Sequence, residues 1–147
     1  MSANVIGLTR PSVVKALSAG AVAGLGGGLV FGMMMGMMGT LPMIARLVQQ
    51  DNALAGFGVH MLISAFIGAV YGTVAIRLHP GWVTAVIAGM VNGIVWWILG
   101  ALVLMPLLLG MSQMVLVVDT PQWLSLMGHL IYGIVTAILF VPLSRLL

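Results

Sequence analysis

Residues 20–36, GAVAGLGGGLVFGMMMG, carry a glycine at every fourth position inside an uncharged apolar run. On a helix, residues four apart share one face, so these glycines line up. In water each would destabilise a helix by about 1 kcal/mol. Within lipid, a face without side chains instead lets a second helix approach backbone to backbone. The stretch predicts a glycine zipper in a transmembrane helix, against which the rest of a bundle packs. Its members are Gly20, Gly24, Gly28, Gly32 and Gly36.

The composition extends this prediction to the whole chain. Of its 147 residues, 62% are hydrophobic and 5% are charged, whereas a soluble domain carries about 25% charged residues. We therefore expect an integral membrane protein with a single transmembrane domain over residues 1–147. The absence of cysteine excludes disulfides and thiolate metal sites. The five basic residues are not clustered, so a nucleic-acid partner is not expected.

Start and stop signals divide the apolar sequence into four membrane spans, which predicts an all-α four-helix bundle. Residues 39–42, GTLP, end the first span, and residues 51–52, DN, form a good N-cap for the second. The third span is expected to break at Pro106, and DTP at residues 119–121 is a strong start signal for the fourth. Residues 43–50 between the first two spans predict a short interfacial helix. The predicted spans are about 11–38, 53–78, 82–105 and 122–143.

The two halves of the chain resemble each other, which suggests a 2+2 internal repeat. Gly36 precedes Pro42 by six residues, and Gly100 precedes Pro106 by six, so a Gly/Pro break follows spans one and three. A histidine then follows eight or nine residues after the cap of the next helix in each half. With two spans per copy, both copies would have the same orientation in the membrane.

The basic residues predict the orientation of the bundle. Four spans place both termini on one side of the membrane, together with Arg10, Lys15, Arg77 and Arg145, whereas Arg46 lies on the other side. The positive-inside rule therefore predicts cytoplasmic termini in a multi-pass protein. The first apolar run is far longer than that of a signal peptide, so we expect it to be an uncleaved span.

His60 and His129 are the main candidates for a functional site. Each lies about 12–14 Å below the start of its helix at 1.5 Å per residue, inside the membrane and at a similar depth. Ionisable groups there are rare and often functional. If both face the bundle axis, they could ligate one metal, most plausibly a b-type haem iron, with Ser64 and Tyr132 on the same faces. Alternatively, each imidazole donates to a backbone carbonyl of a neighbouring helix and serves packing.

Two further features bear on cofactors and catalysis. Methionines crowd residues 33–43, and their soft thioethers suit copper(I), although flexible packing against glycine is the more economical reading. Asp51 and Asp119 are the only carboxylates and belong to different loops. A hydrolytic acid–base pair is therefore not expected, and enzymatic activity is disfavoured.

Two segments carry a family resemblance. They are GVHMLISAFIGAVYG at residues 58–72 and MGHLIYGIV at residues 127–135. Together they resemble the YagU-like bacterial inner-membrane proteins of unknown function, over the chain from residue 58 onward. The resemblance carries over to His60, Gly128 and His129, and it implies a bacterial inner membrane and a four-helix form. It implies no activity.

Three functions are compatible with these patterns. The first is a non-catalytic accessory subunit of a larger respiratory or photosynthetic membrane complex, with lipid and other membrane subunits or further copies of itself as partners. The second is a bis-His haem- or metal-binding bundle in electron transfer. The third is a small channel or transporter that uses the Gly/Pro breaks as re-entrant elements.

Overall fold

The computed structural model describes residues 12–78 and 81–146, and helices are the only regular secondary structure in these ranges. Four helical segments are long and apolar enough to cross a membrane, so the protein is an all-α multi-pass membrane bundle, as predicted. Arg10, Pro11 and His79 lie outside the described residues. The spans are α1 (Val13–Met37), α3 (Ala53–Ala75), Trp82–Leu108 and α6 (Thr120–Leu146). The third comprises α4 (Trp82–Trp96), the π-helical η2 (Trp97–Leu104) and α5 (Met105–Leu108).

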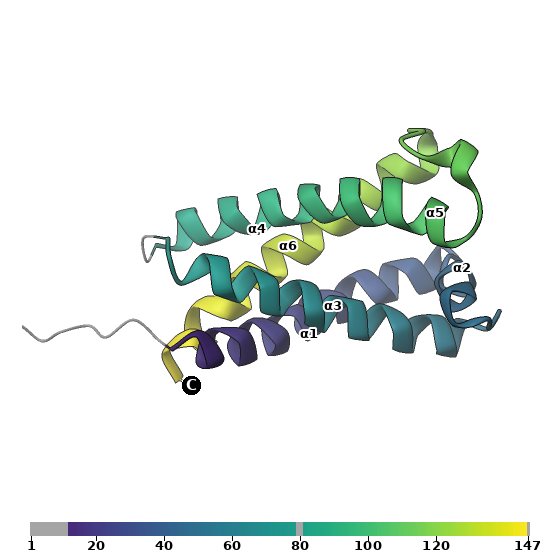
Figure 1. Ribbon diagram of the computed structural model, residues 1–147. Coiled ribbons are helices and arrows are strands. Elements are labelled where there is room, and N and C mark those ends of the chain that lie inside the picture. The colour runs from purple at the N-terminus through teal and green to yellow at the C-terminus, as the bar shows by residue number, and fades with distance from the viewer. Residues whose placement is uncertain (1–11, 79–80, 147) are drawn as a thin grey trace, which may run out of the picture.

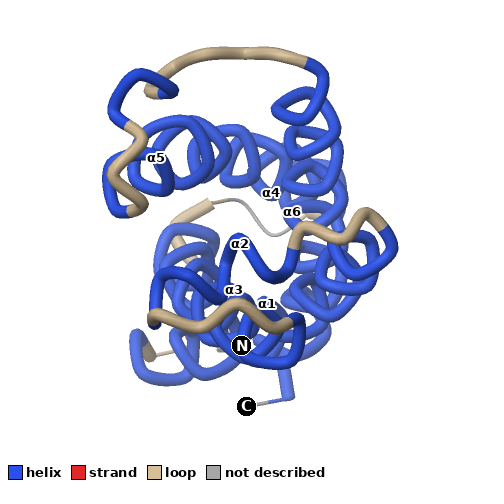
Figure 2. The backbone as a smooth tube through the Cα atoms, turned by 90° about the vertical axis from the view of Figure 1, so that its right-hand side faces the viewer, coloured by secondary structure: helices blue, strands red, loops and turns tan. Residues whose placement is uncertain are grey.

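The four spans pack in the order α3, α1, α6, α4 rather than in chain order (Figures 1 and 2). Contacts are extensive between α1 and α3, between α1 and α6, and between α4 and α6. By contrast, α3 and α4 touch much less, although they are consecutive spans. The start of α1 and the end of α6 lie together, and we call this the terminal end (Figure 1). The opposite end, which carries α2 (Leu41–Ala45) and α5, is the distal end.

Glycine contacts join the helices of each half. A Cβ atom added to Gly24 would lie 2.7 Å from the Cα atom of Gly68 on α3. In the second half, a Cβ on Gly89 of α4 would overlap the carbonyl oxygen of Gly133 on α6. Each hairpin therefore depends on glycine where its two backbones meet.

Gly36 differs from the other four glycines of the predicted face. Gly20, Gly24, Gly28 and Gly32 are all buried in α1. Gly36 is exposed, and a Cβ there would meet only the Leu41 side chain, at 3.6 Å. Gly36 lies in the last turn of α1, just before the chain turns at Gly39, where φ is +68°.

The segment after this turn packs inward. Pro42 lies in the first turn of α2, and a short 3-10 helix, η1 (Arg46–Val48), follows. Leu41, Ile44 and Ala45 of α2 are buried, and α2 lies against α3. The expected interfacial helix over residues 43–50 therefore begins earlier and closes the distal end of the α1/α3 hairpin.

The expected break at Pro106 is wrong, because the helix continues to Leu108 and the chain turns at Gly110, where φ is +71°. Proline has no N–H, so the carbonyl of Leu102, four residues earlier, loses its usual helical donor. The backbone N–H of Leu116 donates to this carbonyl instead, at 3.0 Å. The loop that contains the 3-10 helix η3 (Ser112–Met114) thus folds back onto the helix and supplies the missing hydrogen bond.

Candidate functional site

The first candidate histidine, His60, joins α3 to α1. It is buried in α3, and its Nε2–H donates to the backbone carbonyl of Gly28 at 2.9 Å. The carbonyl is accessible because α1 carries glycine there: a Cβ on Gly32, one turn further, would lie 3.1 Å from the His60 ring. The imidazole therefore acts as an interhelical hydrogen-bond donor in the glycine-lined contact.

Phe31 of α1 lies against both candidate histidines. Its ring centroid is 5.3 Å from that of His60 and 5.0 Å from that of His129, with edge-to-face geometry in both cases. A Cβ on Gly128 of α6 would overlap the Phe31 ring, so this glycine provides the space for the phenyl group. The two imidazoles thus lie at the same depth in the bundle, and both contact the phenyl ring.

His129 is bonded within its own helix. Its Nδ1–H donates to the carbonyl of Ser125, one turn earlier in α6, at 2.8 Å. The backbone carbonyl of the same histidine faces α4, where a Cβ on Gly93 would overlap it. This residue therefore combines a local hydrogen bond with the contact that seats α4 on α6.

Tyr132 connects the helices α6 and α3. Its hydroxyl donates to the carbonyl of Ser64 at 2.7 Å, and both residues are buried. The side chain crosses α1 at Gly24 and Gly27, where added Cβ atoms would meet its hydroxyl and its ring. Ser64 and Tyr132, predicted to flank a cofactor, are thus used to hold three helices together.

The residues present do not fit a haem or metal ion held by both histidines. Each imidazole donates one ring N–H to a backbone carbonyl and keeps its second nitrogen unbonded, so these hydrogen bonds do not by themselves prevent ligation. The obstacle is Phe31, whose ring packs against both imidazoles. Among the described residues, no group of three or more histidine and acidic side chains could hold a metal ion. Neither histidine lines the cavity between α3 and α4. A haem or metal ion bound by both histidines would require the Phe31 ring to leave the space that Gly128 provides for it.

The methionines near the end of α1 do not converge either. Met35 is buried in the core, whereas Met33, Met37 and Met43 are exposed. Successive methionines on a helix point in different directions, so their sulfur atoms spread around α1. Their placement favours packing and lipid contact over a copper site.

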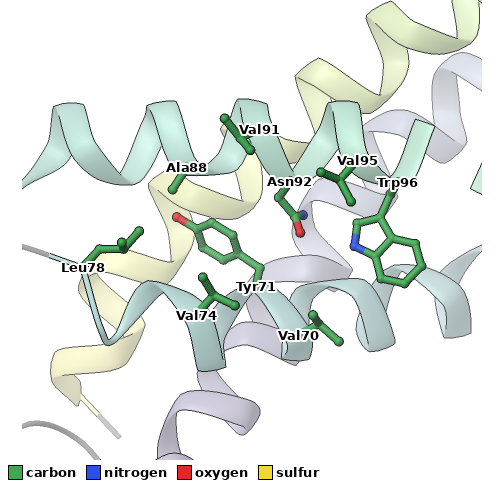
Figure 3. A pocket seen from close by; sticks show the side chains of 9 residues that line it. All are labelled: Val70, Tyr71, Val74, Leu78, Ala88, Val91, Asn92, Val95 and Trp96. Carbon is green, nitrogen blue, oxygen red and sulfur yellow. The ribbon is translucent and has the colours of Figure 1, made fainter. Parts of the chain in front are cut away.

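A cavity lies between α3 and α4, two consecutive spans that contact each other little (Figure 3). Its volume is about 360 Å³, and we call it the α3/α4 groove. It opens on the outer surface of the bundle, since several lining side chains are exposed, Val74, Val91 and Val95 among them. Its lining residues are Val70, Tyr71, Val74, Leu78, Ala88, Val91, Asn92, Val95 and Trp96.

Two polar side chains line this groove. The Tyr71 hydroxyl donates to the carbonyl of Ala85 at 2.9 Å and so ties α3 to α4 near the terminal end. The Asn92 amide reaches into the groove from α4 (Figure 3), and its Nδ2 is buried without a hydrogen-bond partner. Neither residue is among the predicted site residues. Asn92 was detectable as an amide in the middle of an apolar span.

No protein-family model, curated protein or solved structure matches the chain. The resemblance to the YagU-like proteins therefore stays a prediction.

Proposed function

We propose that this protein is a non-catalytic accessory subunit of a larger respiratory or photosynthetic membrane assembly. The hydrogen bonds made by its buried polar side chains support this proposal. His60, Tyr71 and Tyr132 each donate to a backbone carbonyl of another helix. Asp51 and Asp119 are exposed in separate loops. These groups therefore stabilise the bundle and form no acid–base pair.

The exposure of the third span is the observation that carries the proposal. Only 17% of its most apolar window is buried, compared with 28–39% in the other three spans. Ile87, Ile94 and Ile98 of this span are exposed, so much of its circumference is available to other membrane helices. A span that contributes little to its own core is well suited to contacts between subunits.

We further propose a bacterial inner membrane with cytoplasmic termini. Lys15, Arg77 and Arg145 lie at the terminal end, while Arg46 lies at the distal end. Membrane proteins keep an excess of basic residues on the cytoplasmic side. Cysteine accessibility at the two ends of the bundle tests this orientation.

Site-specific photocrosslinking tests the accessory role. A photoreactive amino acid is placed at Ile87 on the outer face of α4 in the tagged protein, expressed in its own host at natural levels. Leu62, which is exposed on α3, is the matched control position. We expect Ile87 to give one dominant protein adduct, in a complex that migrates well above the monomer on native gels. Lipid adducts alone at both positions, with monomeric migration, contradict the proposal.

A further inference from the structure

Asn92 is an unpaired amide in the middle of a membrane span. It follows Trp82, the first residue of α4, by ten residues, or about 15 Å of helix, which is half of the roughly 30 Å hydrocarbon core. Two buried side-chain polar atoms of the described residues lack a partner, Asn92 Nδ2 and Thr136 Oγ1. Thr136 is fully buried where α6 meets Gly27 of α1. Only Asn92 lines the groove.

An unpaired amide at this depth is costly, because lipid chains offer it no hydrogen bond. Its donor requires an acceptor. Because Nδ2 is enclosed by protein, a half-turn of the side-chain amide is needed to present it to the groove. Elsewhere in this protein, His60, Tyr71 and Tyr132 meet the same need with backbone carbonyls. An oxygen acceptor from a bound ligand would give the Asn92 amide the hydrogen bond that it lacks within the chain.

The dimensions of the groove restrict what can enter it. Along α4 it extends from Ala88 to Trp96, which corresponds to about 12 Å of helix. A volume of about 360 Å³ over this length gives a cross-section of roughly 30 Å². A helix with its side chains is about 10 Å across and does not fit. A single hydrocarbon chain or a flat ring inserted edge-on does.

The depth of Asn92 in the membrane distinguishes between the two ligands that fit the groove, a hydrocarbon chain and a flat ring. The ester carbonyls of a phospholipid stay near the interface, about 15 Å from this amide, so its acyl chain would leave Asn92 unpaired. A lipid-soluble ring that carries its own carbonyl oxygens can reach the membrane centre. Trp96 lies one turn beyond Asn92 on the same helix face and lines the groove. An edge contact with Phe66, at a centroid distance of 5.9 Å, supports its indole ring.

We infer that the α3/α4 groove binds a lipid-soluble quinone. One ring carbonyl accepts the hydrogen bond from Asn92, the ring lies beside the Trp96 indole, and the hydrocarbon tail follows the apolar walls toward Leu78 or out to lipid. The inference concerns binding alone. It goes beyond the accessory role and does not depend on it, since the groove belongs to a single chain.

Quenching of tryptophan fluorescence tests the inference on the full chain in lipid nanodiscs. The probe is decylubiquinone, and the competitor is decylbenzene, which has a ring and a tail but no carbonyl oxygen. We expect saturable quenching that decylbenzene does not reverse. Asn92→Leu, which keeps the side-chain size but removes the donor, is expected to weaken binding about tenfold, since one buried hydrogen bond is lost.

Two further variants serve as controls. Val95→Phe places a ring in the mouth of the groove from an exposed position and is expected to abolish saturable quenching. Ile87→Leu, on the exposed face of α4 and outside the groove lining, is expected to bind as the unmodified protein does. Circular dichroism verifies that each variant is folded, and Val95→Phe tests the groove even where Asn92→Leu does not fold.

Three fluorescence results overturn the inference. They are equal binding by Asn92→Leu and the unmodified protein, equal competition by decylbenzene, and quenching that rises linearly with quinone content in every variant. A phospholipid that stays bound in native mass spectrometry and is not displaced by decylubiquinone also overturns it.

Discussion

Substitution of Gly24 by alanine tests the packing on which the fold depends. In the structure, a Cβ at this position would lie 2.7 Å from Gly68 Cα and 3.0 Å from the Tyr132 hydroxyl, and it would overlap the Ser64 carbonyl oxygen. Carbon atoms pack best at about 3.5–4.0 Å. Two of the three obstructing groups are backbone, so no rotamer change relieves the overlap. Helix α1 must therefore move about 1 Å away from α3.

This displacement sets the size of the expected effect. A gap of about 0.5–1 Å removes a quarter to a half of the dispersion energy of each contact across it. Overpacked cores lose about 1–3 kcal/mol. Alanine also stabilises the helix by about 0.5–1 kcal/mol relative to glycine, because it loses less backbone entropy on folding. We expect Gly24→Ala to lower the free energy of unfolding by about 2 kcal/mol, as the overlap is with rigid backbone.

Gly36→Ala is the matched control on the same helix. Its added methyl group would meet only the Leu41 side chain at 3.6 Å, and the position is exposed. It is therefore expected to leave the free energy of unfolding unchanged or to raise it by up to about 1 kcal/mol. Steric trapping in detergent micelles measures both values. The packing argument is refuted if the two variants have the same stability.

Three further substitutions are expected to have smaller effects. His60→Phe keeps a ring beside Phe31 but loses the bond to α1, and steric trapping is expected to show a loss of about 0.6–1.7 kcal/mol. Tyr132→Phe removes the hydroxyl that reaches α3 and is expected to cost about 1 kcal/mol in the same assay, with no change contradicting its role. Pro106→Ala restores an N–H that competes for the Leu102 carbonyl. Hydrogen exchange at the Leu116 amide is then expected to accelerate, and an unchanged rate would mean that the proline does not hold the loop.

The sequence by itself determined the class of the protein and the number and approximate bounds of its spans. Hydrophobic length and helix caps are local signals, and lipid permits little besides helices for such segments. It also placed both histidines inside the membrane at a common depth. It placed the second helix break wrongly at Pro106, because the donor that completes the helix there comes from Leu116, across a loop.

Only the tertiary structure decided which helices pack together and what the polar residues do. The order α3, α1, α6, α4 depends on which glycine-bearing helix faces contact each other. Each contact involves two helices, so the sequence of one helix does not determine it. The ring of Phe31 beside both histidines belongs to another helix, and so do the carbonyls that His60 and Tyr132 bind. The α3/α4 groove exists because these two helices, adjacent in sequence, are held apart by their stronger contacts with α1 and α6.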